Sequence, residues 1–238
     1  APHTGLDPGS DPYDPSGYEK FRLSHYAPDL MFDEMISFID ANSKKKFFLY
    51  WATPVPHLPL QAPERWVEHY VRKFGDEEPY TGGEGYFPVR YPRATYAAMV
   101  SYLDEQVGRL IDHLKELGIY ENTLIIFSSD NGYAWNAGCD PAWFNSEAPW
   151  ITTYGWGKGF VHEGGIRVPC IVRWPGVTAP GTVSDSLVHV TDWLPTLLEA
   201  AGTCAPASHS LDGISRLPLL RGGQLTEREL FWYMPFYE

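Results

Sequence analysis

The sequence has few cysteines, few basic residues and no long apolar run, and each shortage excludes a class of protein. Three cysteines in 238 residues are too few for a disulfide-rich scaffold, and their spacing does not match a zinc finger. No apolar stretch approaches the roughly 20 residues of a membrane-spanning helix. Lys and Arg number 18 against 30 Asp and Glu, a net charge of -12, which works against general affinity for nucleic acid or anionic membranes. We therefore expect a globular protein with neither partner, in which an anionic substrate must meet locally placed cations.

Signals for export are also missing from the sequence itself. The first residues, APHTGLDPGSDPYDPSG, have neither the basic nor the apolar part of a signal peptide, and there is no initiator Met. Residues 1–27 are rich in Pro, Gly and Asp at the start, which predicts an irregular N-terminal arm.

Alternating periodicities predict an α/β fold. We expect helices over residues 28–40, 92–117 and 192–201, and strands over 46–51, 123–128, 166–174 and 183–190. Strands that alternate with helices indicate a mixed, largely parallel sheet sandwiched between helices. Residues 75–90, rich in Gly and Pro, are expected to form an exposed excursion.

The long helix should bury one apolar stripe, because its large apolar residues recur at spacings of three and four. The stripe consists of Tyr96, Val100, Leu103, Val107, Leu110, Leu114 and Leu117.

The apolar run LIIFSSDNG ends abruptly on Asp130 and Asn131. Ligands of α/β proteins bind at the carboxyl ends of strands, and carboxylate and amide oxygens suit a hard cation such as Ca²⁺ or Mg²⁺. The alternative is that Asp-Asn-Gly is an ordinary turn, since these residue types dominate turns.

Two further side chains are candidates for contact with an anionic ligand. His57 lies between Pro56 and Pro59 on a stiff loop, which suits hydrogen bonding to an anion or a leaving group. Lys158 is flanked by Gly157 and Gly159, which permit close approach of a ligand. The alternatives are a surface histidine and a solvated lysine.

Four blocks of sequence together resemble the sulfatases of the alkaline phosphatase superfamily. They are FFLYWATPVPHLPLQAP, LIIFSSDNG, GWGKGFVHEGGIRVP and VTDWLPTLLEAAG, in the family's order. The resemblance implies that Asp130 and Asn131 ligate a divalent cation, usually Ca²⁺. It also implies that Lys158 and His57 are catalytic, with Lys158 neutralising the sulfate and His57 assisting the leaving oxygen.

The sequence also departs from the family. Sulfatases use a formylglycine made within a Cys/Ser-x-Pro/Ala-x-Arg motif, and these 238 residues hold no such nucleophile motif. Cys139 and Cys204 are each followed by x-Pro but lack the Arg, and we interpret both as coincidence. The resemblance therefore implies a middle segment, with a partial sulfatase domain over 28–228 and the start of a C-terminal subdomain over 229–238.

We expect the parent protein to be a sulfuric ester hydrolase that removes sulfate from sulfated sugars or polysaccharides, located in the periplasm or secreted. This chain alone is expected to be inactive, whether it comes from a truncated enzyme or a decayed paralogue. Trp135, Trp143 and Trp156 are candidate substrate-binding residues, although most aromatic residues are simply core. The alternatives are a phosphate or phosphonate ester hydrolase of the same superfamily and a non-catalytic binding protein.

Overall fold

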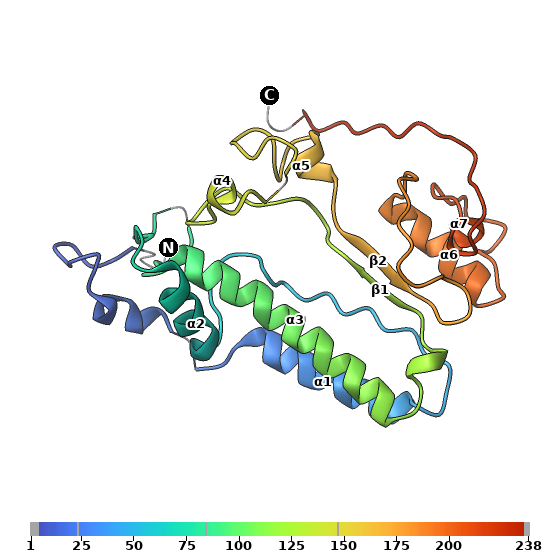
Figure 1. The fold of residues 1–238 in the computed structure, drawn as a ribbon, viewed down its shortest axis with the longest axis horizontal. Helices are drawn as coiled ribbons and strands as arrows, with labels where there is room; N and C mark the ends of the chain where they lie inside the picture. Colours follow the sequence, from blue (N-terminus) through green and yellow to red (C-terminus); the bar gives the residue numbers. More distant parts are fainter. Residues whose placement is uncertain (1–4, 23, 84, 147, 236–238) are drawn as a thin grey trace. The chain divides into compact units, whose positions relative to one another are not determined.

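A computed structural model describes residues 5–22, 24–83, 85–146 and 148–235 (Figure 1). The chain divides into two compact units. Unit 1 comprises residues 1–120, 130–168 and 236–238, and unit 2 comprises residues 121–129 and 169–235. The expected boundaries at residues 27 and 228 remain predictions. Within the described residues, no helix is both long enough and apolar enough to cross a membrane.

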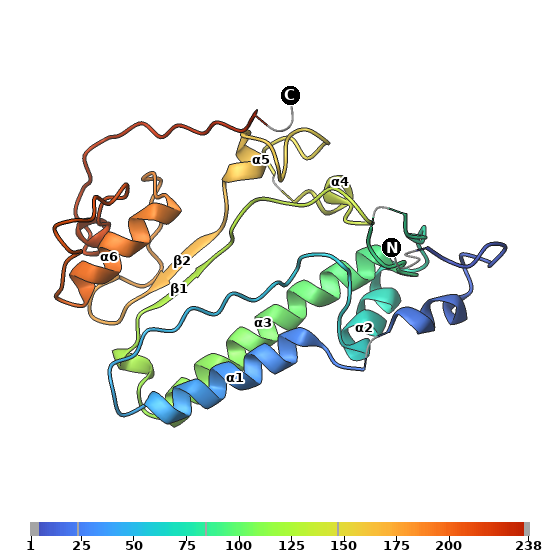
Figure 2. The same ribbon diagram turned by 180° about the vertical axis from the view of Figure 1, so that it is seen from behind.

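Unit 1 is helical and is organised around one long helix. Its elements are η1 (Pro15–Phe21), α1 (Ala27–Asn42), α2 (Glu64–Phe74), α3 (Pro92–Glu116), α4 (Pro141–Phe144) and α5 (Glu163–Ile166). A 3-10 turn, η2 (Tyr120–Asn122), follows α3. Figures 1 and 2 both show α1 alongside α3, with α2 near the N-terminal part of α3. The predicted helices over 28–40 and 92–117 are thus confirmed.

Helices α1 and α3 run in the same direction and are joined by two polar contacts. The Tyr102 hydroxyl, near the middle of α3, donates to Asp29 near the start of α1. Near their ends, His113 Nε2 lies 2.7 Å from Asp40 Oδ1. Met35 and Ile39 of α1 are buried.

The prediction of the buried stripe on α3 is wrong in detail. Val100 is 46% exposed, and of the stripe only Leu114 is buried. The buried face instead carries Ala94, Ala98 and Tyr102, with Gln106 donating to the Pro28 carbonyl at 3.2 Å. Small side chains such as alanine let neighbouring elements approach closely. Because alanine contributes little to a hydropathy pattern, the periodicity of the large residues predicted burial of the adjacent face.

The segment at 75–90 is anchored rather than fully exposed, contrary to expectation. Glu77 is buried, and its carboxylate accepts hydrogen bonds from the backbone N–H groups of Arg93 and Ala94 at 2.8 and 2.9 Å. Burial raises the pKa of this carboxyl, and the two N–H bonds offset the rise only in part. Glu77 thereby satisfies donors at the N-terminus of α3 that no residue of the helix itself can reach.

Unit 2 contains a two-stranded sheet and short helices. Strands β1 (Ile125–Ser128) and β2 (Cys170–Arg173) pair antiparallel, with Ile125 opposite Arg173 and Ser128 opposite Cys170. The helical elements are η3 (Val190–Asp192), α6 (Trp193–Ala200) and α7 (Leu217–Leu220). The strands predicted near 123–128 and 166–174 and the helix at 192–201 are therefore confirmed, with shorter bounds.

The other two predicted strands are not formed in the described residues. Residues 46–51 are extended, but Phe48 and Tyr50 are 70% and 80% exposed, while Phe47 and Trp51 pack their rings against Phe38 and Phe32 of α1. A strand requires a neighbouring backbone to complete its ladder, and the described residues supply none here. Residues 183–189 are also irregular, with Val183 93% exposed, and Val190 begins η3.

An acidic side chain lies at the centre of unit 2. Asp192 is fully buried and accepts from Arg216 Nε and Arg228 Nη1, each at 2.8 Å. Backbone N–H groups of His189 and Ile214 add two more bonds, at 2.8 and 3.0 Å. Burial by itself raises the pKa of Asp192, but the bonds from Arg228 and Arg216 outweigh it and hold the pKa far below its usual range. This ion cluster ties the segment after α7 to the start of α6.

Candidate functional site

The proline-rich loop that carries His57 is fixed by its own apolar residues. Val55, Leu58 and Leu60 are buried in a cluster with Met99 of α3, and Ala137 and Cys139 complete the cluster. Between these anchors His57 stays exposed. A loop with alternate buried residues holds the intervening side chain at the surface without a helix or strand.

The His57 ring is oriented by the loop. Its Nδ1 lies 2.8 Å from the carbonyl oxygen of Leu58, and because a carbonyl only accepts, Nδ1 must carry the proton in this contact. The ring also lies edge-on to Tyr86, with centroids 6.4 Å apart. The Nδ1 contact and the Tyr86 ring together fix the orientation of the imidazole.

Asp130 and Asn131 form a compact turn. Asp130 Oδ1 accepts from the Asn131 backbone N–H at 2.8 Å, and Asn131 Nδ2 donates to the Gly132 carbonyl at 3.0 Å. The turn interpretation and the ligand interpretation are thus compatible, since the turn orients one carboxylate and one amide oxygen.

Backbone pairing brings Lys158 to the segment that follows this turn. The Lys158 N–H donates to the Tyr133 carbonyl at 2.9 Å, and the Gly132 N–H donates to the Gly165 carbonyl at 3.0 Å. Trp135 Nε1 donates to the Lys158 carbonyl at 3.4 Å. The half-buried Lys158 is therefore held beside the chain that leaves Asp130 and Asn131.

Glycines make this pairing possible. A Cβ on Gly132 would lie 1.8 Å from the Gly164 carbonyl oxygen, and a Cβ on Gly165 would lie 2.1 Å from the Phe160 oxygen. A Cβ on Gly157 would meet the Tyr133 ring at 2.5 Å. These glycines are required for close packing of three backbone segments, whereas the sequence predicted for Gly157 a close approach of a ligand.

Backbone hydrogen bonds thus connect the segment of Lys158 with the segment that follows Asp130 and Asn131. The loop of His57 is connected with them through side-chain packing. Ala134, which follows the Asp130 turn, packs against the same apolar cluster as Leu58, the neighbour of His57. Convergence of all four side chains on one ligand stays a prediction.

The three predicted substrate-binding tryptophans have different surroundings. Trp143 packs edge-on to Phe74 and Phe144, each at 4.8 Å between ring centroids, and Arg93 covers its ring. Trp135 packs edge-on to Tyr154 at 4.5 Å. Trp156 stacks on His162 at 4.0 Å, and both line a recess of about 360 Å³ near Lys158. Trp156 is the best placed of the three to meet a ligand.

Sequence reasoning did not single out two residues of this region. Tyr133 donates its hydroxyl to the Ile151 and Thr153 carbonyls at 3.0 and 3.2 Å, which holds the 151–153 loop against the Lys158 segment. His162 contributes the stack on Trp156. The signal for both was their position next to a motif, because Tyr133 directly follows SDNG and His162 directly precedes EGG.

The oxygen donors match the chemistry of Ca²⁺ or Mg²⁺ but do not fill a coordination shell. Ca²⁺ takes about 6–8 oxygen ligands, whereas Asp130 and Asn131 offer two side chains. The described residues contain no cluster of three or more His, Cys, Asp or Glu able to hold a metal.

Cys139 does not lie in the environment of a nucleophile. Cys139 is buried, and burial raises the pKa of its thiol to about 12. A thiol so rarely ionised is a poor nucleophile.

Comparison with known proteins agrees with these observations. The family model for Sulfatase matches residues 4–203. N-acetylgalactosamine-6-sulfatase of Canis lupus familiaris is 34% identical over 191 residues, covering 80% of this chain and 31% of that protein. Arylsulfatase J of Mus musculus is 39% identical over 169 residues, covering 71% and 24%.

Among solved structures, Ps i-CgsB in complex with k-i-k-neocarrahexaose has a TM-score of 0.67 and 32% identity, covering 82% of this chain and 38% of that chain. This likeness confirms the predicted α/β fold class of the alkaline phosphatase type. The chain spans about a third of the length of the curated relatives it matches. With the family model matching residues 4–203 and the SDNG turn paired to the Lys158 segment, the chain belongs to the sulfatase family.

Proposed function

We propose that the full-length protein that carries this chain hydrolyses sulfate esters of sugars. The observation that carries the proposal is the backbone pairing of residues 132–133 with residues 158 and 165, which supports assigning Lys158 to the same site as Asp130 and Asn131. The family membership and the names of the relatives, among them N-acetylgalactosamine-6-sulfatase, support the substrate class.

Each residue has a distinct role in this proposal. Lys158 neutralises the negative charge of the sulfate, in a half-buried position where its charge is less screened than in open water. His57 keeps one proton on Nδ1, which is bound to the Leu58 carbonyl; as an imidazolium it carries a second proton on Nε2, gives that proton to the leaving oxygen and becomes neutral.

Asp130 and Asn131 would hold part of the shell of a divalent cation, Ca²⁺ with Mg²⁺ as the alternative. When bound, the cation would supply positive charge that polarises the ester. The remaining ligands and the formylglycine, which supplies the attacking oxygen, would come from outside these 238 residues. Family membership also supports a periplasmic or secreted location.

The test is a paired assay of the full-length protein with 4-nitrophenyl sulfate and 4-nitrophenyl phosphate, followed by N-acetylgalactosamine 6-sulfate. We expect preferential hydrolysis of the sulfate and release of sulfate from the sugar. Preference for the phosphate would favour a phosphate or phosphonate ester hydrolase. Absence of turnover on every ester would favour the non-catalytic binding protein. The 238-residue chain alone should be inactive, because it lacks the attacking group.

A further inference from the structure

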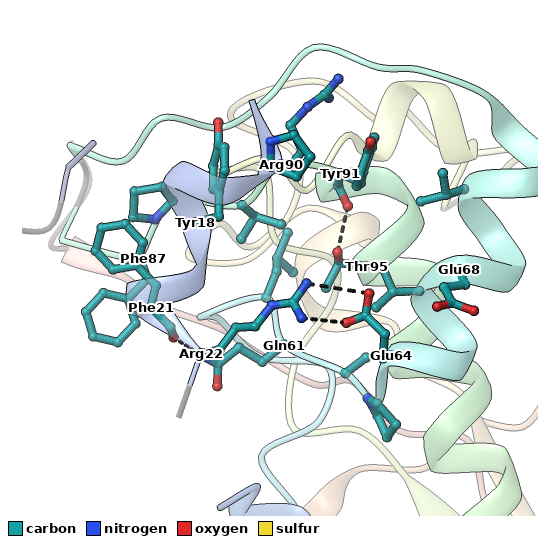
Figure 3. Close-up of a pocket in the computed structure, with 18 of the residues that line it drawn as sticks. Tyr18, Phe21, Arg22, Gln61, Glu64, Glu68, Phe87, Arg90, Tyr91 and Thr95 are labelled. Atoms are coloured by element: carbon teal, nitrogen blue, oxygen red, sulfur yellow. Dashed lines mark hydrogen bonds and ion pairs between the residues drawn. The ribbon is translucent and has the colours of Figure 1, made fainter. Parts of the chain in front are cut away.

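Unit 1 contains a second pocket that none of these roles uses. It has a volume of about 480 Å³, within the range of small-molecule sites. Figure 3 shows it between η1, the loop that follows His57, α2 and the residues before α3.

Aromatic rings and paired charges line the pocket. Tyr18, Phe21, Phe87 and Tyr91 contribute rings, and the Phe21 and Phe87 rings lie together at one end, with centroids 5.5 Å apart (Figure 3). The Arg22 guanidinium faces the Glu64 carboxylate, with Nη1 3.2 Å from Oε2. The pocket thus offers flat apolar surfaces next to groups that donate and accept hydrogen bonds.

The walls are held in place by hydrogen bonds. Gln61 Nε2 donates to the Phe21 carbonyl at 3.2 Å, which joins η1 to the His57 loop (Figure 3). The Tyr26 hydroxyl donates to the Gln61 carbonyl at 2.8 Å. A site with fixed walls loses little entropy when it binds a ligand.

The arginines of the pocket are each paired with a carboxylate. Besides Arg22 with Glu64, Arg72 lies 3.6 Å from Glu68, and Arg90 pairs with Asp76. These arginines therefore supply no surplus of positive charge to the pocket. A second sulfate group bound here would be repelled by the carboxylates of Glu64 and Glu68. An uncharged ring suits the pocket better, because sugar hydroxyls can bond to both members of the Arg22–Glu64 pair and the sugar's apolar face can pack on an aromatic ring.

Two segments that line the pocket are adjacent in sequence to His57 or to a residue that contacts it. Residues 60–63 follow His57 on its loop, and Phe87 follows Tyr86, whose ring packs against His57. In the proposed reaction, the oxygen that His57 protonates stays on the sugar, whereas Lys158 binds the sulfate. The sugar must then extend from the His57 side.

We propose that this pocket binds an uncharged sugar residue linked to the sulfated one, so that the protein acts on an oligosaccharide whose neighbouring residue carries no sulfate. The proposal rests on the proposed function for the position of the sulfated sugar. It assigns Arg22, Glu64 and Phe87 to substrate specificity rather than to the chemistry.

The test uses the full-length protein with Arg22→Ala, Phe87→Ala and the control Lys115→Ala. Lys115 forms an exposed ion pair with Asp112 at 2.9 Å on α3 and lies outside the pocket. Substrates are 4-nitrophenyl sulfate, N-acetylgalactosamine 6-sulfate, the disaccharide in which this sugar is linked to galactose, and the same disaccharide with a sulfated galactose.

We expect the wild type to prefer the disaccharide with unsulfated galactose. Arg22→Ala and Phe87→Ala should each lower kcat/KM for it about tenfold, the scale of one lost aromatic or charged contact. Activity on 4-nitrophenyl sulfate should stay within about twofold in both variants, and Lys115→Ala should change neither activity. Arg22→Ala should fold, because exposed ion pairs contribute little to stability.

Equal losses on the aryl sulfate and the disaccharide would overturn the proposal, as would an unchanged kcat/KM for the disaccharide or a preference for the sulfated galactose. If no ester is hydrolysed, the proposed function fails and the pocket is tested separately. Binding of the unsulfated disaccharide is then measured by saturation-transfer NMR. Weaker binding by Arg22→Ala than by the wild type supports the pocket. Absence of binding, or equal binding by the wild type and Arg22→Ala, overturns it.

Discussion

The backbone N–H of Lys158 donates to the carbonyl oxygen of Tyr133 across 2.9 Å, so the backbone of the candidate sulfate-binding residue is fixed to the chain three residues after Asp130. The position of Lys158 is therefore set by the backbone rather than by its flexible side chain. This relationship leads to the first prediction.

Lys158→Ala in the full-length protein should reduce turnover of 4-nitrophenyl sulfate by about 10²-fold or more, the scale of losing one preorganised charge-stabilising donor. Lys158→Arg should also impair turnover, because a planar guanidinium does not replace a compact ammonium between glycines. Steady-state kinetics measure both effects, with Lys115→Ala as the control cation. Unchanged turnover in Lys158→Ala would refute the assigned role.

Gly132→Ala should destabilise the protein by about 1–3 kcal/mol, the usual cost of overpacking, because the new Cβ would lie 1.8 Å from the Gly164 carbonyl oxygen. Gly108 in α3 is the matched control, since a Cβ there has nothing within 4 Å. Gly108→Ala should be neutral or stabilising by up to about 1 kcal/mol. Urea unfolding compares the two, and equal stability would mean that the tight pairing of residues 132 and 165 is not maintained.

Asp192→Asn should lower the free energy of unfolding by about 3–5 kcal/mol, because it leaves the buried Arg216 and Arg228 without their counter-charge. Asp212→Asn, at an exposed-loop carboxylate near Arg216 in sequence, serves as the control and should change stability by less than about 1 kcal/mol.

The same residue gives a prediction about acid stability. The folded-state pKa of Asp192 is depressed, so its contribution to stability is present above the unfolded pKa of about 3.9. That contribution is lost as the pH falls below this value toward the folded pKa. Unfolding measured between about pH 5 and pH 2 should therefore show a steeper acid loss in the wild type than in Asp192→Asn. Parallel curves would contradict the ion cluster.

The 238-residue chain should bind Ca²⁺ weakly, with a Kd above about 10⁻³ M, because two side chains supply a small part of the usual shell. Asp130→Asn should weaken binding further by removing the negative charge, while Asp112→Asn on α3 should not. Calorimetry measures each Kd. Tight, stoichiometric binding by this chain would show that it holds a complete metal site.

Local patterns in the sequence determined the long helices and the candidate site residues. The 3.6-residue periodicity and Gly118 specify α3, whose observed bounds are Pro92–Glu116, because amphipathic helices form wherever one face can be buried. Asp130, Asn131 and Lys158 stood out because their residue types and glycine neighbours fit an anion and cation site. His57 stood out because prolines restrict its loop.

The tertiary structure decided which faces are buried and which segments pair. The buried face of α3 carries Ala94, Ala98 and Tyr102 rather than most of the large apolar stripe, because burial depends on how near neighbouring elements can approach. The segment 46–51 has the composition of a strand but has no paired backbone among the residues that the structure describes, since a strand is completed only by residues distant in sequence. The contact of Lys158 with Tyr133 and the pairing of Asp192 with two arginines likewise join residues far apart in the chain, a relation that no local pattern encodes.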